Sequence, residues 1–278
     1  MNTILKVQHL SVSFTQYGRG FGRRTIDAVK DLNMKIGEGE IVAVVGSSGS
    51  GKSLLAHAIM GILPYNASME GTMEFDGAPL TMERVKKIRG HEMVLVPQSV
   101  SYLDPLMKVG AQITKGGKSP SIIEKCQKVL AGYGLGKEVM GQYPFQLSGG
   151  MIRRVLISTA VMETPKLVIA DEPTPGLHME AAGRVMSHFR EMAETGAGVL
   201  LITHDLELAL MTADRIVVLY AGQAIEEADS AAFSDEENLR HPYTKALCRF
   251  MPGKWSSEGD QLCGTGEILE YMRKEYGR

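Results

Sequence analysis

The chain has 278 residues, of which 44% are hydrophobic and 22% are charged. This composition is ordinary for a globular protein and excludes a disordered or fibrous chain. The 30 Lys and Arg residues face 32 Asp and Glu residues, so the net charge of -2 gives no indication of a nucleic-acid-binding surface. Three cysteines are too few for a disulfide scaffold, and we therefore expect a reducing compartment.

The apolar runs of the sequence are short. The longest cover residues 41–45, 199–202 and 216–220, whereas a membrane-spanning helix needs about 20 apolar residues. Residues 1–14 lack the apolar stretch and cleavage site of a secretory signal. We expect a chain that does not cross a membrane by itself.

The first part of the chain alternates between strand and helix patterns. Residues 4–14 alternate apolar and polar side chains and predict an antiparallel strand, whereas residues 41–45 are a continuous β-branched run, typical of a strand buried on both faces. A helix is expected over 54–60 and a short strand over 71–75. Residues 18–24 are expected to form a basic, solvated loop.

The middle of the chain, about residues 101–164, has few strand patterns and predicts a mostly helical subdomain, with one helix starting at Ser148 as its N-cap. Strand patterns then return, alternating with helical ones, and a short helix is expected to end near residue 250. The alternation predicts an α/β fold. The expected strands cover residues 167–170, 199–203 and 215–220.

One segment matches the pattern G-x-x-x-x-G-K-[ST] and follows the buried strand at 41–45. Its glycines permit a tight turn whose backbone N–H groups converge on phosphate oxygens; Lys52 adds a cation and Ser53 offers a hydroxyl to Mg²⁺. The alternative, a Gly/Ser-rich turn that contains Lys-Ser by chance, does not explain both flanks. The candidate phosphate-binding residues are Gly46, Ser47, Ser48, Gly49, Ser50, Gly51, Lys52 and Ser53.

Three polar residues follow two other predicted buried strands. Asp171 and Glu172 follow the strand at 167–170, and His204 follows the strand at 199–203. Asp171 is a candidate for holding Mg²⁺ and Glu172 for polarising an attacking water, as in P-loop NTPases. His204 is a candidate for orienting that water. The alternatives are a surface acidic pair and a structural histidine.

The order of these motifs resembles that of the nucleotide-binding subunit of ABC transporters: phosphate loop, Gln98, Leu147–Met151, Asp171-Glu172, His204. The resemblance runs from about residue 4 to 250. It implies a P-loop NTPase core with an N-terminal antiparallel β subdomain and an inserted α-helical subdomain at about 100–164. It thus implies one ATP-binding domain over residues 1–250, followed by a C-terminal tail at 251–278.

The resemblance also implies a head-to-tail dimer with ATP between two ATPase subunits. Ser148, Gly149 and Gly150 would act in trans on the partner's ATP. Gln98 would meet Mg²⁺ and relay the nucleotide state to the helical subdomain. Phe14 would lie against adenine, with ordinary core burial as the alternative and Tyr17 as a weaker candidate.

Further motifs resemble the oligopeptide, dipeptide and nickel importers within this family, among them Tyr102–Leu106 and His241–Leu247. Many peptide-importer members carry a C-terminal cysteine cluster, but here Cys248 and Cys263 are the only late cysteines, which favours a nickel or metal-chelate importer. Implied partners are a second, paralogous ATPase, transmembrane permease subunits and, indirectly, an extracytoplasmic substrate-binding protein. The implied location is peripheral, on the cytoplasmic face of the cell membrane.

Two residues depart from the family pattern. His178 stands where an Asp normally couples the two ATP sites, and Arg153 stands where Gln is common. His178 keeps open an alternative function, an ATP-binding regulatory or structural subunit with a degenerate partnered site. Two other alternative functions fit the sequence less well. A DNA-repair or translation ATPase needs a coiled coil or a second domain, and a small-molecule kinase does not explain Ser148–Gly150.

Overall fold

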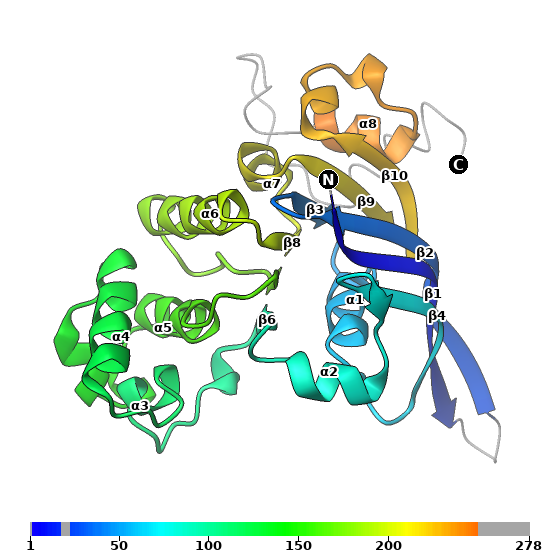
Figure 1. Ribbon diagram of the computed structural model, residues 1–278. Coiled ribbons are helices and arrows are strands. Elements are labelled where there is room, and N and C mark those ends of the chain that lie inside the picture. The colour runs from blue at the N-terminus through cyan, green and yellow to red at the C-terminus, as the bar shows by residue number, and fades with distance from the viewer. Residues whose placement is uncertain (1, 18–22, 250–278) are drawn as a thin grey trace.

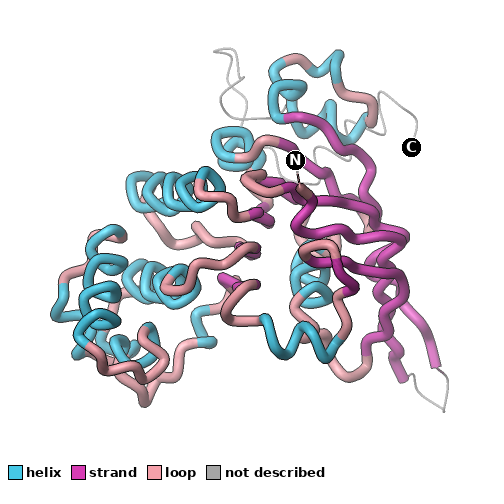
Figure 2. The backbone as a smooth tube through the Cα atoms, in the orientation of Figure 1, coloured by secondary structure: helices cyan, strands magenta, loops and turns pink. Residues whose placement is uncertain are grey.

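The computed structural model describes residues 2–17 and 23–249, and Figure 1 shows their arrangement. A six-stranded sheet occupies the centre, a four-stranded antiparallel sheet lies on one side of it and a group of helices on the other (Figures 1 and 2). Over these residues, no helix combines the length and the apolar character needed to cross a bilayer.

The central sheet is parallel except at one edge. Its strand order is β10-β9-β3-β8-β7-β6, and only the β10–β9 pair is antiparallel. Every residue of β3 is buried, and alternate residues face two different core clusters, which confirms the prediction of a strand covered on both faces. The strands are β3 (Ile41–Val45), β6 (Met93–Val96), β7 (Leu167–Asp171), β8 (Gly198–Thr203), β9 (Arg215–Tyr220) and β10 (Gln223–Asp229).

Different elements cover the two faces of this sheet. Helix α1 and the antiparallel sheet share one core cluster with the sheet, and helices α5 to α8 share the other. Helix α2 packs on the first face through Val85 and Ile88. The bounds are α1 (Lys52–Ile59), α2 (Met82–Ile88), α6 (Met179–Glu194), α7 (Leu206–Thr212) and α8 (Pro242–Arg249).

The antiparallel sheet has the order β2-β1-β4-β5. Its strands are β1 (Thr3–Tyr17), β2 (Arg23–Gly37), β4 (Ala67–Phe75) and β5 (Ala78–Pro79). The prediction of a loop at 18–24 was wrong for Arg23 and Arg24, because both lie in β2 and pair with Tyr17 and Gln16 of β1. Residues 18–22, the rest of that predicted loop, lie outside the described residues.

The helical group has its own core. All buried members of this third cluster lie between Leu103 and Met162, which agrees with the prediction that about 101–164 is mostly helical. The predicted N-cap at Ser148 is confirmed, since its Oγ accepts a hydrogen bond from the Met151 amide at 3.4 Å. The helices are α3 (Val109–Ile113), α4 (Pro120–Gly132) and α5 (Gly149–Val161), and short 3-10 turns cover Val100–Tyr102, Lys137–Gly141 and Pro144–Gln146. Two further 3-10 turns, Ser230–Ser234 and Glu236–Asn238, precede α8.

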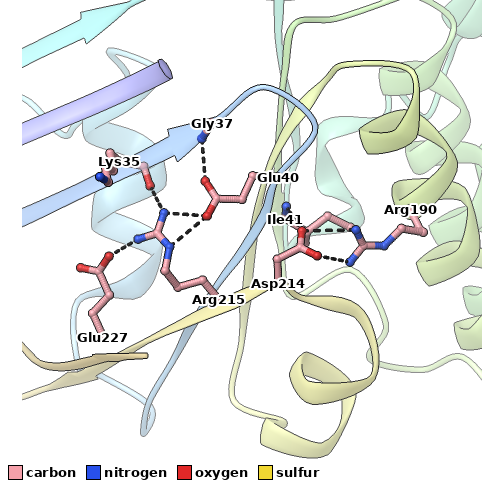
Figure 3. A network of polar contacts seen from close by, with 8 residues as sticks. All are labelled: Lys35, Gly37, Glu40, Ile41, Arg190, Asp214, Arg215 and Glu227. Carbon is pink, nitrogen blue, oxygen red and sulfur yellow. Dashed lines mark hydrogen bonds and ion pairs between the residues drawn. The ribbon is translucent and has the colours of Figure 1, made fainter. Parts of the chain in front are cut away.

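Ion pairs fix the starting ends of the central strands (Figure 3). Arg215, the first residue of β9, donates to Glu40 at 2.9 Å and also pairs with Glu227 of β10. Asp214 accepts a hydrogen bond from the amide of Ile41, the first residue of β3, at 2.8 Å. These contacts tie the start of β3 to the start of β9, and β9 to β10, at the end of the strands opposite their carboxyl ends.

Candidate active site

The predicted phosphate loop joins β3 to α1 at the carboxyl edge of the sheet. Helix α1 begins at Lys52, two residues earlier than predicted, so Lys52 and Ser53 form its first turn. Gly49 and Gly51 have φ of 79° and 101°, the left-handed region that favours glycine. The loop can therefore turn tightly and direct its free N–H groups toward one point above the helix.

The back of the loop packs against the turn between β9 and β10. A Cβ atom on Gly46 would lie 2.1 Å from the carbonyl oxygen of Leu219, so only glycine fits there. The Gly222 amide donates to the Ser50 carbonyl at 3.2 Å. The Ser50 Oγ is buried and has no hydrogen-bond partner among the described residues. The position of the loop is thus set by backbone contacts.

Lys52 is buried beneath the loop, and its ammonium donates to the carbonyl oxygens of Gly46 at 2.7 Å and Ser47 at 3.0 Å. Burial lowers the pKa of Lys52, while the carboxylates of Glu172 and Asp171 act in the opposite direction. These contacts keep the cation next to the point where the loop amides converge.

Asp171 ends β7 facing α1. The Ser53 Oγ donates to its Oδ1 at 3.1 Å, and its side chain is almost fully buried. Burial raises the pKa of Asp171, and the nearby Glu172 adds to this effect, whereas the hydrogen bond from Ser53 opposes it. A hydroxyl and a carboxylate this close provide the oxygen ligands that Mg²⁺ prefers, so the residues present fit this cation.

The raised pKa of Asp171 makes a prediction for stability. The folded chain keeps this proton to higher pH than the unfolded chain, so the carboxyl costs stability as pH rises above its ordinary pKa of 3.8. We expect Asp171→Asn, without nucleotide, to be more stable than wild type by about 1 kcal/mol at pH 8, although its ATPase activity is lost. Urea unfolding of both proteins between about pH 4 and 8 measures this; a difference that does not grow with pH contradicts it.

Glu172 and His204 form a pair next to Asp171. Glu172 has a φ of 48°, rare for a residue other than glycine, and its amide donates to the carbonyl of Ile202 at 2.8 Å. Its carboxylate is buried and accepts hydrogen bonds from the His204 Nδ1, 2.8 and 2.9 Å from the two oxygens. His204 is 62% exposed. The imidazole therefore orients the carboxylate and keeps its own Nε2 for other partners.

A cavity of about 220 Å³ brings several predicted residues together. The phosphate loop, the Gln98 segment and Glu172 all contribute to its wall, as does Leu54, which was not predicted. Of the residues that the structure describes, its lining consists of Ser48, Gly49, Gly51, Lys52, Ser53, Leu54, Gln98 and Glu172.

Other predicted residues lie outside this cavity lining. Phe14, on β1, is half-buried and packs against the core cluster of the antiparallel sheet, opposite Ile26 and Ala67. Ser148 and Gly149 are exposed at the start of α5. The adenine contact and the trans contacts remain predictions.

Arg153, which departs from the family pattern, lies next to the Gln98 segment of this site. It is 7% exposed on α5, and its guanidinium donates to the carbonyl of Pro97, next to Gln98, at 3.0 Å. Burial lowers its pKa, while Glu172 and Asp171 act in the opposite direction. The side chain thus ties the helix that starts at Ser148 to the Gln98 segment. A charged residue on the buried face of a helix is the signal that indicates such a role.

Comparison with known proteins identifies the family. The family model described as ABC transporter matches residues 29–175. The chain is 34% identical to the oligopeptide transport ATP-binding protein OppD of Lactococcus lactis subsp. cremoris, over 99% of this chain and 83% of that protein. It is 36% identical to the dipeptide transport ATP-binding protein DppD of Escherichia coli K12, over 96% and 83%.

The fold agrees with solved structures of the same family. A dimeric structure of the bacterial ABC transporter cassette MJ0796 aligns with a TM-score of 0.71 and 27% identity, covering 82% of this chain and 99% of that one. The same cassette has been solved as a dimer in a post-hydrolysis state with ADP and Pi, with the same TM-score. The predicted fold class is therefore confirmed, and this chain belongs to the ABC transporter family as an ATP-binding subunit that hydrolyses ATP.

Proposed function

We propose that this chain powers the import of short peptides and that its ATP site is the cavity at the carboxyl edge of the central sheet. The observation that carries the proposal is the convergence of Lys52, Gln98 and Glu172 on this cavity, with the Ser53–Asp171 hydrogen bond beside it. The peptide substrate is supported by the relatives, which are oligopeptide and dipeptide transport proteins.

Each residue has one task in this proposal. The amides of Gly46–Ser53 and the Lys52 ammonium bind the phosphates of ATP. Ser53, Gln98 and Asp171 hold Mg²⁺, which neutralises phosphate charge when bound. Glu172 polarises the attacking water, and His204 keeps the Glu172 carboxylate in place through the contacts at 2.8 and 2.9 Å.

The exposed start of α5 supports a partner ATPase. Ser148 is an N-cap at the start of a helix, where free N–H groups attract anions, yet it is not among the residues that line the cavity of its own chain. We propose that Ser148, Gly149 and Gly150 complete the site of a second ATPase subunit, a paralogue of this chain. Solved MJ0796 cassettes are dimers, which supports this arrangement.

An apolar groove supports docking on permease subunits at the cytoplasmic face of the membrane. This groove of about 570 Å³ lies between the central sheet and the helical group and is lined by Met60, Tyr102, Leu103 and Leu156, among others. Tyr102 is 57% exposed and Leu106 nearby is 84% exposed. An extracytoplasmic substrate-binding protein would act through the permease.

We also propose a division of the chain into two parts. Residues 1–250 form the ATP-binding domain, with a helical subdomain at about 100–164, and residues 251–278 form a C-terminal tail.

Uptake in cells lacking this chain tests the substrate. Labelled short peptide and labelled nickel are supplied in parallel, and the plasmid-borne chain with intact Lys52 is compared with Lys52→Ala. We expect peptide uptake to be lost without the chain and restored only by the intact form. Loss of nickel uptake alone would overturn the peptide proposal. It would favour the prediction of a metal importer, which was based on the number of late cysteines. One of these, Cys263, lies outside the described residues.

His178 provides a test of the alternative, a regulatory subunit with a degenerate partnered site. His178 is exposed just before α6 and makes no side-chain cap hydrogen bond. If it weakens coupling between the two ATP sites, His178→Asp should raise the ATPase activity of the assembled complex about fivefold, the low end of coupling free energies. ATPase activity equal to that of wild type would show that His178 in place of Asp does not weaken the coupling between the two ATP sites.

A further inference from the structure

Arg153 is a buried cation on α5 that the proposed function does not use. A guanidinium taken out of water needs hydrogen-bond acceptors to compensate for the lost hydration. The Nε of Arg153 is buried and has no such acceptor among the described residues. Because an apolar side chain could be buried here at a lower cost in free energy, stability alone does not account for an arginine at this position.

The guanidinium reaches from α5 to the segment that follows β6. Helix α5 packs beside β6 (Figure 1), and the Nη1 of Arg153 donates to the carbonyl of Pro97 at 3.0 Å in a buried contact. This carbonyl belongs to the planar peptide group that joins Pro97 to Gln98. Gln98 in turn lines the ATP cavity. Arg153 therefore holds the backbone from which a cavity-lining side chain extends.

The orientation of this peptide group depends on a single torsion angle. The ring of Pro97 fixes φ, so only rotation about ψ of Pro97 turns its carbonyl and, with it, the amide of Gln98. Residues 97–99 belong to no helix or strand, and Gln98 is exposed. No side-chain hydrogen bond fixes Gln98 within the described structure. The contact with Arg153 is thus a direct restraint on the conformation of this segment.

We propose that Arg153 is a positioning residue that holds Gln98 in the conformation that binds Mg²⁺. Arg153 is not among the residues that line the cavity and acts through the Pro97 carbonyl. The proposal rests on the proposed function of Gln98 as a ligand of Mg²⁺. Without the contact, Gln98 samples other orientations, and the apparent affinity for Mg²⁺ falls with the population of the competent one.

Binding of the nucleotide without Mg²⁺ should not depend on Arg153. The phosphate loop is held by other contacts, among them the hydrogen bond from the Gly222 amide to the Ser50 carbonyl at 3.2 Å. The proposal therefore separates two quantities, the affinity for ATP in the absence of Mg²⁺ and the gain in affinity when Mg²⁺ is added.

Two substitutions remove the contact. Gln, the residue common at this position in the family, ends at the nitrogen that corresponds to Nε, two bonds short of the Nη1 that donates to Pro97. Met has no N–H donor in its side chain. Arg84→Met is the matched control, because the Nη1 of Arg84, on α2, also donates to backbone carbonyls, those of Phe75 and Ala78, and Arg84 lies outside the cavity lining.

The measurement is equilibrium binding of a non-hydrolysable ATP analogue to the assembled complex, in EDTA and in excess Mg²⁺. We expect Arg153→Gln and Arg153→Met to match wild type in EDTA and to lose about fivefold of the gain that Mg²⁺ provides, as for one lost hydrogen bond. The Mg²⁺ concentration for half-maximal ATPase activity should rise by the same factor. Arg84→Met should change none of these values by as much as about twofold.

Two results would overturn the proposal. One is a gain from Mg²⁺ in Arg153→Gln equal to that of wild type. The other is an equal weakening in EDTA and in Mg²⁺, which would indicate a general packing effect. In a Gln98→Ala background, Arg153→Gln should have no further effect, because it acts through Gln98.

Gln98→Ala alone separates this inference from the proposed function. If Gln98→Ala keeps the full gain from Mg²⁺, the proposed role of Gln98 as a Mg²⁺ ligand fails. If Gln98→Ala loses that gain while Arg153→Gln keeps it, only the role of Arg153 fails.

Discussion

Replacing Glu172 by Gln is expected to lower the ATP turnover of the assembled complex more than about 100-fold while ATP remains bound. Gln has nearly the same shape, so the contact with His204 and the backbone hydrogen bond to Ile202 persist. An amide cannot accept a proton from water as a carboxylate can, and the loss of that function corresponds to at least about 3 kcal/mol in the activation free energy.

Turnover and equilibrium ATP binding, measured on the same preparation, check this expectation. Glu207→Gln is the matched control, since it removes one carboxylate from an exposed position in the first turn of α7. ATPase activity of Glu172→Gln close to that of wild type would exclude Glu172 as the water-polarising group. A loss of ATP binding would instead indicate that Gln at this position, with its φ of 48°, distorts the loop edge.

The central parallel strands could be predicted because burial on both faces requires continuous apolar runs. The predicted runs at 41–45, 167–170 and 199–203 correspond to β3, β7 and β8. The polar residues at the carboxyl ends of β7 and β8 lie at the same edge of the sheet; they are Asp171, Glu172 and His204. Motif spacing could place these residues together because carboxyl ends of parallel strands meet at one edge.

Other parts of the fold and the site depend on contacts between residues far apart in the chain. Strand β10 is mostly polar or half-exposed, since it pairs on one side only, and its sequence lacks an apolar run. Arg24 looks like a loop residue but pairs with Gln16 across the β1–β2 hairpin. Arg153 contacts Pro97, 56 residues away in the sequence. No local pattern encodes these pairs.

Replacing Gly46 by Ala is expected to destabilise the chain by about 3 kcal/mol and to abolish ATP binding. The new Cβ would lie 2.1 Å from the carbonyl oxygen of Leu219 and 3.0 Å from the Ser50 Oγ. The Leu219 carbonyl is backbone of β9, which is paired on both sides, with β10 and with β3, so it cannot rotate away as a side chain can. Either β9 shifts, or the loop lifts from it and its amides no longer converge on the phosphates.

Gly183→Ala is the control for this substitution, because Gly183 lies exposed within α6 and an added Cβ would meet no atom within 4 Å. In that helix Ala should be more stable than Gly by about 0.5–1 kcal/mol, so the same chemical change has opposite signs at the two positions. Urea unfolding and ATP titration of both variants measure the difference. Wild-type stability and ATP affinity in Gly46→Ala would contradict the close packing of the phosphate loop on β9.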